Sequence, residues 1–183
     1  MFIQTEQTPN PATLKFLPGC TVMERGTANF PDRGSAARSP LAERLFEMAE
    51  VTGVFLGADF ITVTKNGDTD WHQLKPAVLA AVMEHFTAGR PVITGEAPET
   101  AATADGDDDE IVGQIKELLE TRVRPAVAMD GGDITFEDFE DGIVYLHMQG
   151  SCSGCPSSTA TLKAGIENML RHYIPEVVEV RAV

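Results

Sequence analysis

Residues 94–107 have a composition that disfavours folding, and they divide the chain in two. Glycine, alanine, threonine, proline and acidic residues make up this stretch, which has no aromatic residue and no aliphatic side chain larger than alanine. Such a segment cannot bury enough apolar surface to fold alone, and structureless loops of this length are uncommon inside compact domains. We therefore predict a flexible acidic linker between two small α+β domains, residues 1–93 and 108–183 of a chain of 183 residues.

The first domain is predicted to combine strands and two helices in one small α+β layer. The helices are expected from Ser39-Pro40 to near Gly53 and from Asp70 to Gly89, because each begins at a capping residue and continues with apolar residues at helical spacing. Strands are expected at 13–17, 54–56 and 60–64, the last two joined as a hairpin.

The second domain is predicted to have the order α-β-β-α-β. Its first helix begins at Asp107 to Glu110 and is interrupted or ended by Pro125. Asp141-Gly142 is a strong signal for a two-residue hairpin turn. The later helix carries a predicted buried stripe, and a last strand covers 177–183; the stripe consists of Leu162, Ile166, Met169 and Tyr173.

The stretch from Gly150 to Ser158 reads Gly-Ser-Cys-Ser-Gly-Cys-Pro-Ser-Ser and lies between a predicted strand and a predicted helix. Its glycines allow a tight curl, and the C-x-x-C spacing lets the sulfurs of Cys152 and Cys155 point at one centre. Pro156 fits the first helical position, which puts Cys155 at the N-cap, where the helix dipole favours a thiolate. Because thiolates bind metals, we predict a metal-thiolate loop near the surface.

The loop is incomplete as a metal site. Iron–sulfur clusters of the two-iron and four-iron types usually need four cysteines, and a closed zinc site needs four ligands, whereas this loop supplies two. The others are expected from another part of the chain, from a small thiol, or from the same loop of a second subunit across a two-fold axis. Cys20, the only other cysteine, cannot complete the set alone.

The charge of the chain argues against some classes of partner. The net charge is −14, with −2 on residues 1–93, −4 on residues 94–107 and −8 on residues 108–183. This balance repels phosphate backbones and anionic lipid, so we expect neither nucleic acid nor membrane as a partner. The N-terminal residues lack the features of a signal peptide, and three cysteines with one close pair suit a reducing compartment. We expect a cytoplasmic protein or, as the alternative, a mature protein of the mitochondrial matrix.

Two further motifs carry a resemblance to known families. Asp130-Gly131-Gly132-Asp133, followed by Gly150–Ser158, resembles the C-terminal domain of the NifU family. The first half of the chain resembles the N-terminal domain of Nfu-type proteins in three short motifs, Thr8-Pro9-Asn10-Pro11, Leu14-Lys15-Phe16 and Pro18-Gly19. Together the resemblances cover almost the whole chain apart from the linker. Ser151 stands where the family often has alanine, which is not expected to disturb ligation.

The resemblance implies a carrier or scaffold, not itself an enzyme, for a 4Fe-4S cluster of iron and sulfide. It implies that Cys152 and Cys155 of each of two subunits hold the cluster in a homodimer and that the cluster passes to apo iron–sulfur client proteins. Upstream cluster assembly proteins are implied as further partners, and the N-terminal domain is assigned to client recognition or to modulating the second domain. We expect shared ligation to make the cluster labile, because a client's cysteines can separate the thiolates without unfolding either domain.

Two other readings of the cysteine pair stay open. A thiol-disulfide oxidoreductase also begins a helix with C-x-x-C after a strand, but the pair here encloses Ser153-Gly154 and no tryptophan precedes it. A zinc ion bridging two subunits would make a structural dimer. Four other residues are expected not to be metal ligands. Cys20 is expected to be a non-ligand cysteine and His147 a structural or half-exposed histidine. Asp130 and Asp133 are expected to be turn residues beside Gly-Gly.

Overall fold

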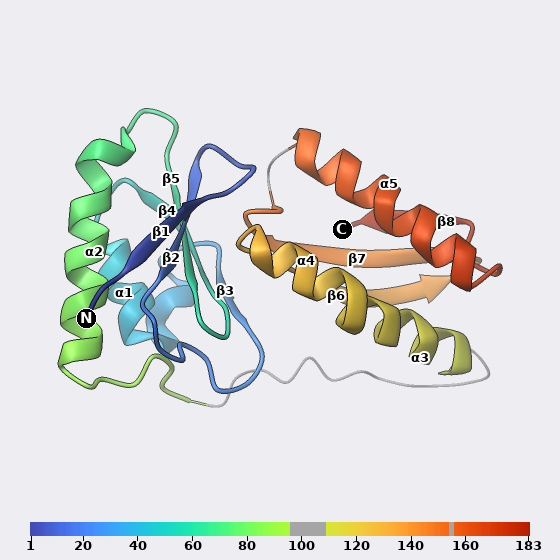
Figure 1. Cartoon of the computed structure of the whole chain (residues 1–183), viewed down its shortest axis with the longest axis horizontal. Helices are drawn as coiled ribbons and strands as arrows, with labels where there is room; N and C mark the ends of the chain where they lie inside the picture. Colours follow the sequence, from blue (N-terminus) through green and yellow to red (C-terminus); the bar gives the residue numbers. More distant parts are fainter. Residues whose placement is uncertain (96–108, 154–155) are drawn as a thin grey trace. The chain divides into compact units, whose positions relative to one another are not determined.

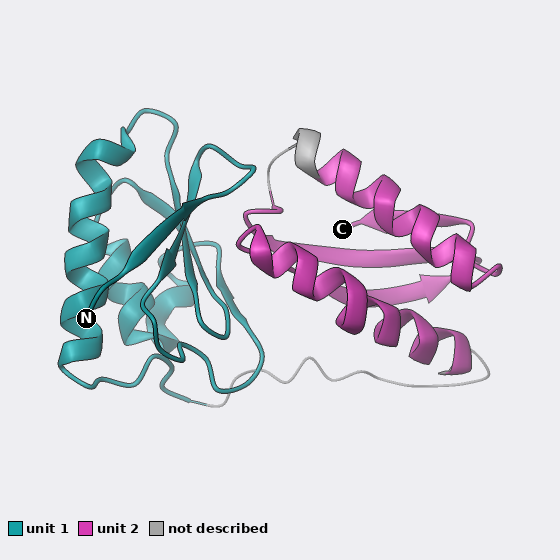
Figure 2. Ribbon diagram, in the orientation of Figure 1, with its two compact units in different colours: residues 1–99 teal, residues 100–183 magenta. Residues whose placement is uncertain are grey.

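The computed structural model describes residues 1–95, 109–153 and 156–183. The chain divides into two compact units, residues 1–99 and 100–183 (Figure 2). Each unit packs helices against one sheet, which confirms the predicted α+β class. The predicted linker lies outside the described residues from residue 96 onward, so its flexibility and the exact domain limits stay predictions. Within the described parts of the chain, no helix is long and apolar enough to cross a membrane.

The first unit is a five-stranded antiparallel sheet with helices α1 (Pro40–Phe46) and α2 (Trp71–Thr87) packed against it (Figure 1). A short 3₁₀ helix, Ser35–Arg38, precedes α1. The strand order is β1-β2-β5-β4-β3, with bounds Gln4–Gln7 for β1, Thr13–Leu17 for β2, Ala28–Phe30 for β3, Val51–Leu56 for β4 and Ile61–Lys65 for β5. The core contains fully buried Phe16, Phe30 and Leu41.

Local sequence signals explain where the helices of this unit begin. The Ser39 hydroxyl accepts a hydrogen bond from the Ala42 N–H, and the Asp70 carboxylate accepts one from the His72 N–H. Both predicted starts and the β4–β5 hairpin are confirmed. The predicted end of the first helix near Gly53 is wrong, because α1 stops at Phe46 and Val51 already pairs with Lys65 across β4 and β5. Strand pairing overrides helical spacing there.

The second unit is a three-stranded sheet of order β6-β7-β8 with its helices on one face. Its elements follow the predicted order, with bounds Asp109–Leu118 for α3, Arg124–Met129 for α4, Gly132–Glu140 for β6, Ile143–Gly150 for β7, Pro156–Tyr173 for α5 and Glu179–Ala182 for β8. Strand β7 runs antiparallel to β6 and parallel to β8. Alternate β7 side chains, Val144, Leu146 and Met148, enter the core with buried residues of α4 and α5.

The β6–β7 hairpin places the cysteine loop. Its two-residue turn has positive φ at both positions, 52° at Asp141 and 79° at Gly142, as the Asp-Gly signal predicts. The register shifts at an irregularity between Phe136 and Asp138, and beyond it Gly132 pairs with Gly150 at the far end of the hairpin. The segment after β7 therefore emerges beside the segment that enters β6.

One prediction for the second unit is confirmed in part and another is wrong. Pro125 does not end the helical segment, but the regular helix is interrupted just before it, where a π-helical turn, Leu119–Val123, joins α3 to α4. The wide turn accommodates a residue that lacks the N–H of a regular helix. Tyr173 is exposed rather than buried, because Leu170 and Ile174 continue the apolar stripe from Ile166 in steps of four.

Candidate functional site

The first half of the cysteine loop is a tight turn docked on the Asp130–Gly132 segment. Gly150 has a φ of 67°, which favours glycine, and the Ser153 N–H donates to the Gly150 carbonyl at 3.1 Å. The Ser151 N–H donates to the Gly131 carbonyl at 3.3 Å, and the Ser151 hydroxyl donates to the Asp130 carbonyl. These bonds connect the two motifs that carry the family resemblance.

Three features fix the position of Cys152. Its side chain is 6% exposed and belongs to the hydrophobic core of its unit. A methyl group added to Gly132 would lie 2.6 Å from its sulfur, so the sulfur occupies the space that only a glycine leaves open. The Thr159 hydroxyl, from the first turns of α5, donates to the Cys152 carbonyl at 3.0 Å.

The described part of the loop is more buried than expected. Ser151 and Cys152 are buried, and Ser153 is exposed. The prediction of a surface loop is therefore wrong for Cys152, because its turn folds back onto the start of β6. Helix α5 begins at Pro156 as predicted. Cys155 lies outside the described residues, and its predicted N-cap position stays a prediction.

The structure differs from the sequence-based expectation at Asp133. This residue is not a turn residue: it lies in β6, is 3% exposed, and forms a two-pronged ion pair with Arg124. Hydrogen bonds to Asp133 raise the pKa of the Arg124 guanidinium. Asp130, in contrast, follows the last residue of α4 at the turn before β6, as expected.

Sequence reasoning missed Arg124 entirely. No motif signals it, because its partner is nine residues away in another element, and the contact depends on how α4 packs against β6. The only available sequence signal was the run of apolar residues at steps of four, Ile115, Leu119, Val123 and Val127, which a regular helix does not keep on one face.

The other singled-out residues lie as follows. His147 is partly exposed on β7, with its Nδ1 3.2 Å from the Val183 carbonyl oxygen, in agreement with a half-exposed histidine. Cys20 is exposed and lies in the first unit, after a Gly19 with φ 77°. Within the described residues, no group of three or more histidine, cysteine, aspartate or glutamate side chains could hold a metal ion.

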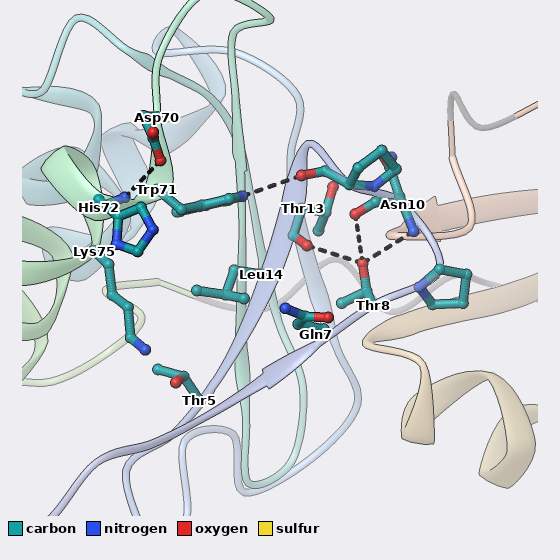
Figure 3. A pocket seen from close by; sticks show the side chains of 12 residues that line it. Thr5, Gln7, Thr8, Asn10, Thr13, Leu14, Asp70, Trp71, His72 and Lys75 are labelled. Carbon is teal, nitrogen blue, oxygen red and sulfur yellow. Dashed lines mark hydrogen bonds between the residues drawn. The ribbon is translucent and has the colours of Figure 1, made fainter.

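A cavity of about 540 Å³ lies in the first unit between β1, the β1–β2 loop and the start of α2 (Figure 3). Its rim is ordered by the loop motif: the Trp71 indole N–H donates to the Pro11 carbonyl at 3.1 Å, and the Thr8 hydroxyl donates to the Thr13 carbonyl at 2.9 Å. Thr5 and Gln7 of β1 and Lys75 of α2 complete a wall that mixes polar and apolar groups. The cavity contains no cysteine, and its chemistry suits binding rather than metal ligation.

Two family models match this chain, one in each unit. A family model described as "Scaffold protein Nfu/NifU N terminal" matches residues 3–89, and one described as "NifU-like domain" matches residues 115–181. A solution structure of a NifU-like protein from Saccharomyces cerevisiae is 25% identical, with a TM-score of 0.48 over 52% of this chain and 87% of its own.

Two relatives are similar over nearly the whole chain. A human protein named NFU1 iron-sulfur cluster scaffold homolog, mitochondrial, is 55% identical over 100% of this chain and 72% of its own length. NifU-like protein 4, mitochondrial, of Arabidopsis thaliana is 55% identical over 97% of this chain and 64% of its own. This chain thus spans about two thirds of the relatives' lengths. With both of its units matched in order, the chain belongs to the Nfu/NifU family of scaffold proteins.

Proposed function

We propose that this chain carries a 4Fe-4S cluster as cargo between two copies of itself, bound by Cys152 and Cys155 of each, and transfers it to apo iron–sulfur proteins. The observation that carries the proposal is the fixed position of Cys152, one of only two cysteines in the loop. One loop supplies half of the four thiolates that such a cluster takes. The name of the human relative, an iron–sulfur cluster scaffold, supports the same role.

The donor set suits this cargo. Cysteine sulfurs are the ligands that iron–sulfur clusters take, and the apolar surroundings of Cys152 limit the access of water to its sulfur. The Gly150–Ser153 turn ends at the exposed Ser153, so a shift of this turn alone would bring the Cys152 sulfur to the surface. Clients can then exchange ligands without unfolding either domain.

The roles of the remaining parts follow from the same proposal. We assign residues 108–183 to cluster binding, the N-terminal domain to client recognition, and neither to catalysis. The cavity beside Trp71 offers hydroxyl, amide, imidazole, carboxylate and amine groups to a partner. If clients bind there, Lys75→Glu slows transfer to a client and leaves cluster loading unchanged. Unchanged transfer by this variant would remove the cavity from the proposal.

The names of both relatives place those proteins in mitochondria. They support the mitochondrial matrix as the place where this chain acts and give no support to the cytoplasm. Upstream assembly proteins of the same compartment would then supply the cluster. Fractionation of cells with an antibody against this chain distinguishes the two locations.

Anaerobic reconstitution of the full chain with iron and sulfide tests the central proposal. A brown dimer with about four iron atoms per dimer is expected. Cys152→Ser and Cys155→Ser should each abolish the chromophore, whereas Cys20→Ala should keep it. A monomer that holds a full cluster, or a chromophore that survives loss of either loop cysteine, would overturn the proposal.

The same preparations distinguish the two other readings of the cysteine pair. A thiol-disulfide oxidoreductase stays colourless and reduces an insulin disulfide catalytically. A zinc-bridged dimer retains zinc through purification and takes up no iron.

A further inference from the structure

We propose that Arg124 is a positioning residue for the cysteine loop. Its ion pair with Asp133 fixes the β6 backbone at Gly132, and Cys152 packs against this backbone. The inference rests on the proposed function, since it explains how one chain keeps its half of the cluster site in place before a second copy arrives.

The contact between Arg124 and Asp133 has the geometry of a strong ion pair. Arg124 Nε lies 2.9 Å from Asp133 Oδ1, and a terminal guanidinium nitrogen, Nη2, lies 2.9 Å from Oδ2. Oδ1 also accepts a hydrogen bond from the Ile134 N–H at 2.8 Å, so the carboxylate is locked to its own strand. A two-pronged guanidinium fixes both distance and orientation, which a lysine cannot do.

The ion pair is one residue from the surface that Cys152 touches. Asp133 follows Gly132 directly, and these two residues pair with Gln149 and Gly150 on β7. An added Cβ at Gly132 would lie 2.6 Å from the Cys152 sulfur and 3.2 Å from its backbone nitrogen. A shift of a few tenths of an ångström at Gly132 therefore changes the space in which the sulfur lies.

The π-helical turn sets the direction of Arg124. The Arg124 N–H donates to the Leu119 carbonyl, five residues back. A step of four residues overshoots a regular helical turn by about 40°, so the four buried residues from Ile115 to Val127 would drift around a regular helix. The wider turn absorbs part of this drift, which keeps Val123 in the core while Arg124 faces the start of β6. Turns of this kind are frequent at functional sites.

Charge adds to geometry at this position. Asp133 is buried and directly follows Gly132, which packs against the Cys152 sulfur. A thiolate at Cys152 is anionic, so a carboxylate without its cation would disfavour it. Arg124→Lys keeps the positive charge but loses the two-pronged contact with Asp133, whereas Arg124→Gln loses both. The pair of variants separates positioning from neutralisation.

The first experiment needs no cluster. The reduced full chain is treated with iodoacetamide, and mass spectrometry follows alkylation of Cys152, with the exposed Cys20 as internal reference. We expect Cys152 of Arg124→Lys to react about tenfold faster than in the wild type. Arg122→Gln should react as the wild type, because Arg122 lies over the Tyr173 ring, with its guanidinium carbon 5.3 Å from the ring centroid.

A second control accounts for loss of stability. A Cβ at Gly142 would lie 2.8 Å from Val178 Cγ2, so Gly142→Ala destabilises the same unit at the opposite end of the hairpin. At equal loss of thermal stability, Arg124→Lys should raise Cys152 reactivity more than Gly142→Ala does. Equal reactivity of the two variants means that Arg124 is only structural, and this overturns the proposal.

The reconstituted chain gives the second readout. An excess of an iron chelator should bleach the chromophore about tenfold faster in both Arg124→Lys and Arg124→Gln than in the wild type. If the lifetime of the chromophore falls only in Arg124→Gln, Arg124 acts only by neutralising the charge of Asp133. That result contradicts a positioning role. If the wild type takes up no cluster, the proposed function fails, while the alkylation result still decides the role of Arg124.

Discussion

The Cα of Gly132 faces the sulfur of Cys152 so closely that a methyl group on Gly132 would lie 2.6 Å from it. The same methyl group would meet the Gln149 carbonyl oxygen at 2.8 Å, and that backbone atom cannot move without disturbing β7. Glycine is required here for space, since its φ is not among the positive values.

Gly132→Ala should therefore displace the sulfur and destabilise the second unit by about 1–3 kcal/mol. Urea denaturation of the metal-free chain measures the loss of stability, and absorbance after reconstitution measures the loss of cluster. Gly113→Ala is the matched control, because no atom lies within 4 Å of an added methyl group on this glycine of α3. That variant should be more stable than the wild type by about 1 kcal/mol. Wild-type stability and loading in Gly132→Ala would contradict the steric account.

Ser151→Ala separates loop stability from ligation. The Ser151 hydroxyl donates to the Asp130 carbonyl, and the residue is 2% exposed. Its loss removes this hydrogen bond and should lower the unfolding free energy by about 0.5–1.5 kcal/mol. Cluster absorbance at full reconstitution should stay unchanged, because the hydroxyl is no ligand in the proposal. Ser153→Ala, at an exposed position, should change neither quantity.

Met129→Glu tests the proposed pairing of two loops. Met129 is 75% exposed and directly precedes the Asp130–Gly132 segment on which the loop is docked. If two loops meet across a two-fold axis, two added carboxylates repel each other there and should weaken the cluster-loaded dimer about tenfold. Sedimentation of reconstituted protein gives the dissociation constant.

Val178→Glu is the control for this charge. Val178 is 63% exposed and lies near Gly142, at the other end of the β6–β7 hairpin. It should leave dimer formation as in the wild type. If Met129→Glu and Val178→Glu behave alike, the loops do not face each other.

His85 gives the first unit a dependence on pH. The residue is 3% exposed, and its Nε2 is buried without a hydrogen-bond partner in the described structure. Burial, with a smaller contribution from Arg90, lowers the pKa of His85 below its usual value. A group whose pKa is lower in the folded state contributes stability above its unfolded pKa, near 6.5, and loses it as the pH falls.

The thermal stability of the first unit should accordingly decrease between pH 7.5 and pH 5.5, as measured by circular dichroism. His85→Leu removes the buried imidazole and should flatten this decrease. His72→Gln changes an exposed histidine at the start of α2 and should keep the wild-type slope. A slope that is unchanged in His85→Leu would assign the pH dependence to other groups.

Much of the fold could be predicted because its signals are local. Ser39 and Asp70 mark helix starts through their own side chains, and Asp141-Gly142 marks a hairpin because both residues tolerate positive φ. Pro156 marks the start of α5 for a similar reason. The predictions failed where distant partners decide: α1 ends early because Val51 pairs with Lys65.

The site was predicted only in part for the same reason. The cysteine spacing identifies a thiolate loop, yet no spacing indicates that Cys152 is buried or that Asp133 pairs with Arg124. The burial of Cys152 depends on the β6–β7 register, which brings Gly132 opposite Gly150, and the ion pair depends on how α4 packs against β6.

The sequence by itself determined most of the elements and their order, because turns and caps act over a few residues, and it predicts a thiolate loop from the spacing of two cysteines. Only the tertiary structure decided where Cys152 lies and what holds it. Gly132 packs on the Cys152 sulfur, and Arg124 forms an ion pair with Asp133. Both contacts join segments that meet only after the sheet and the helix have formed.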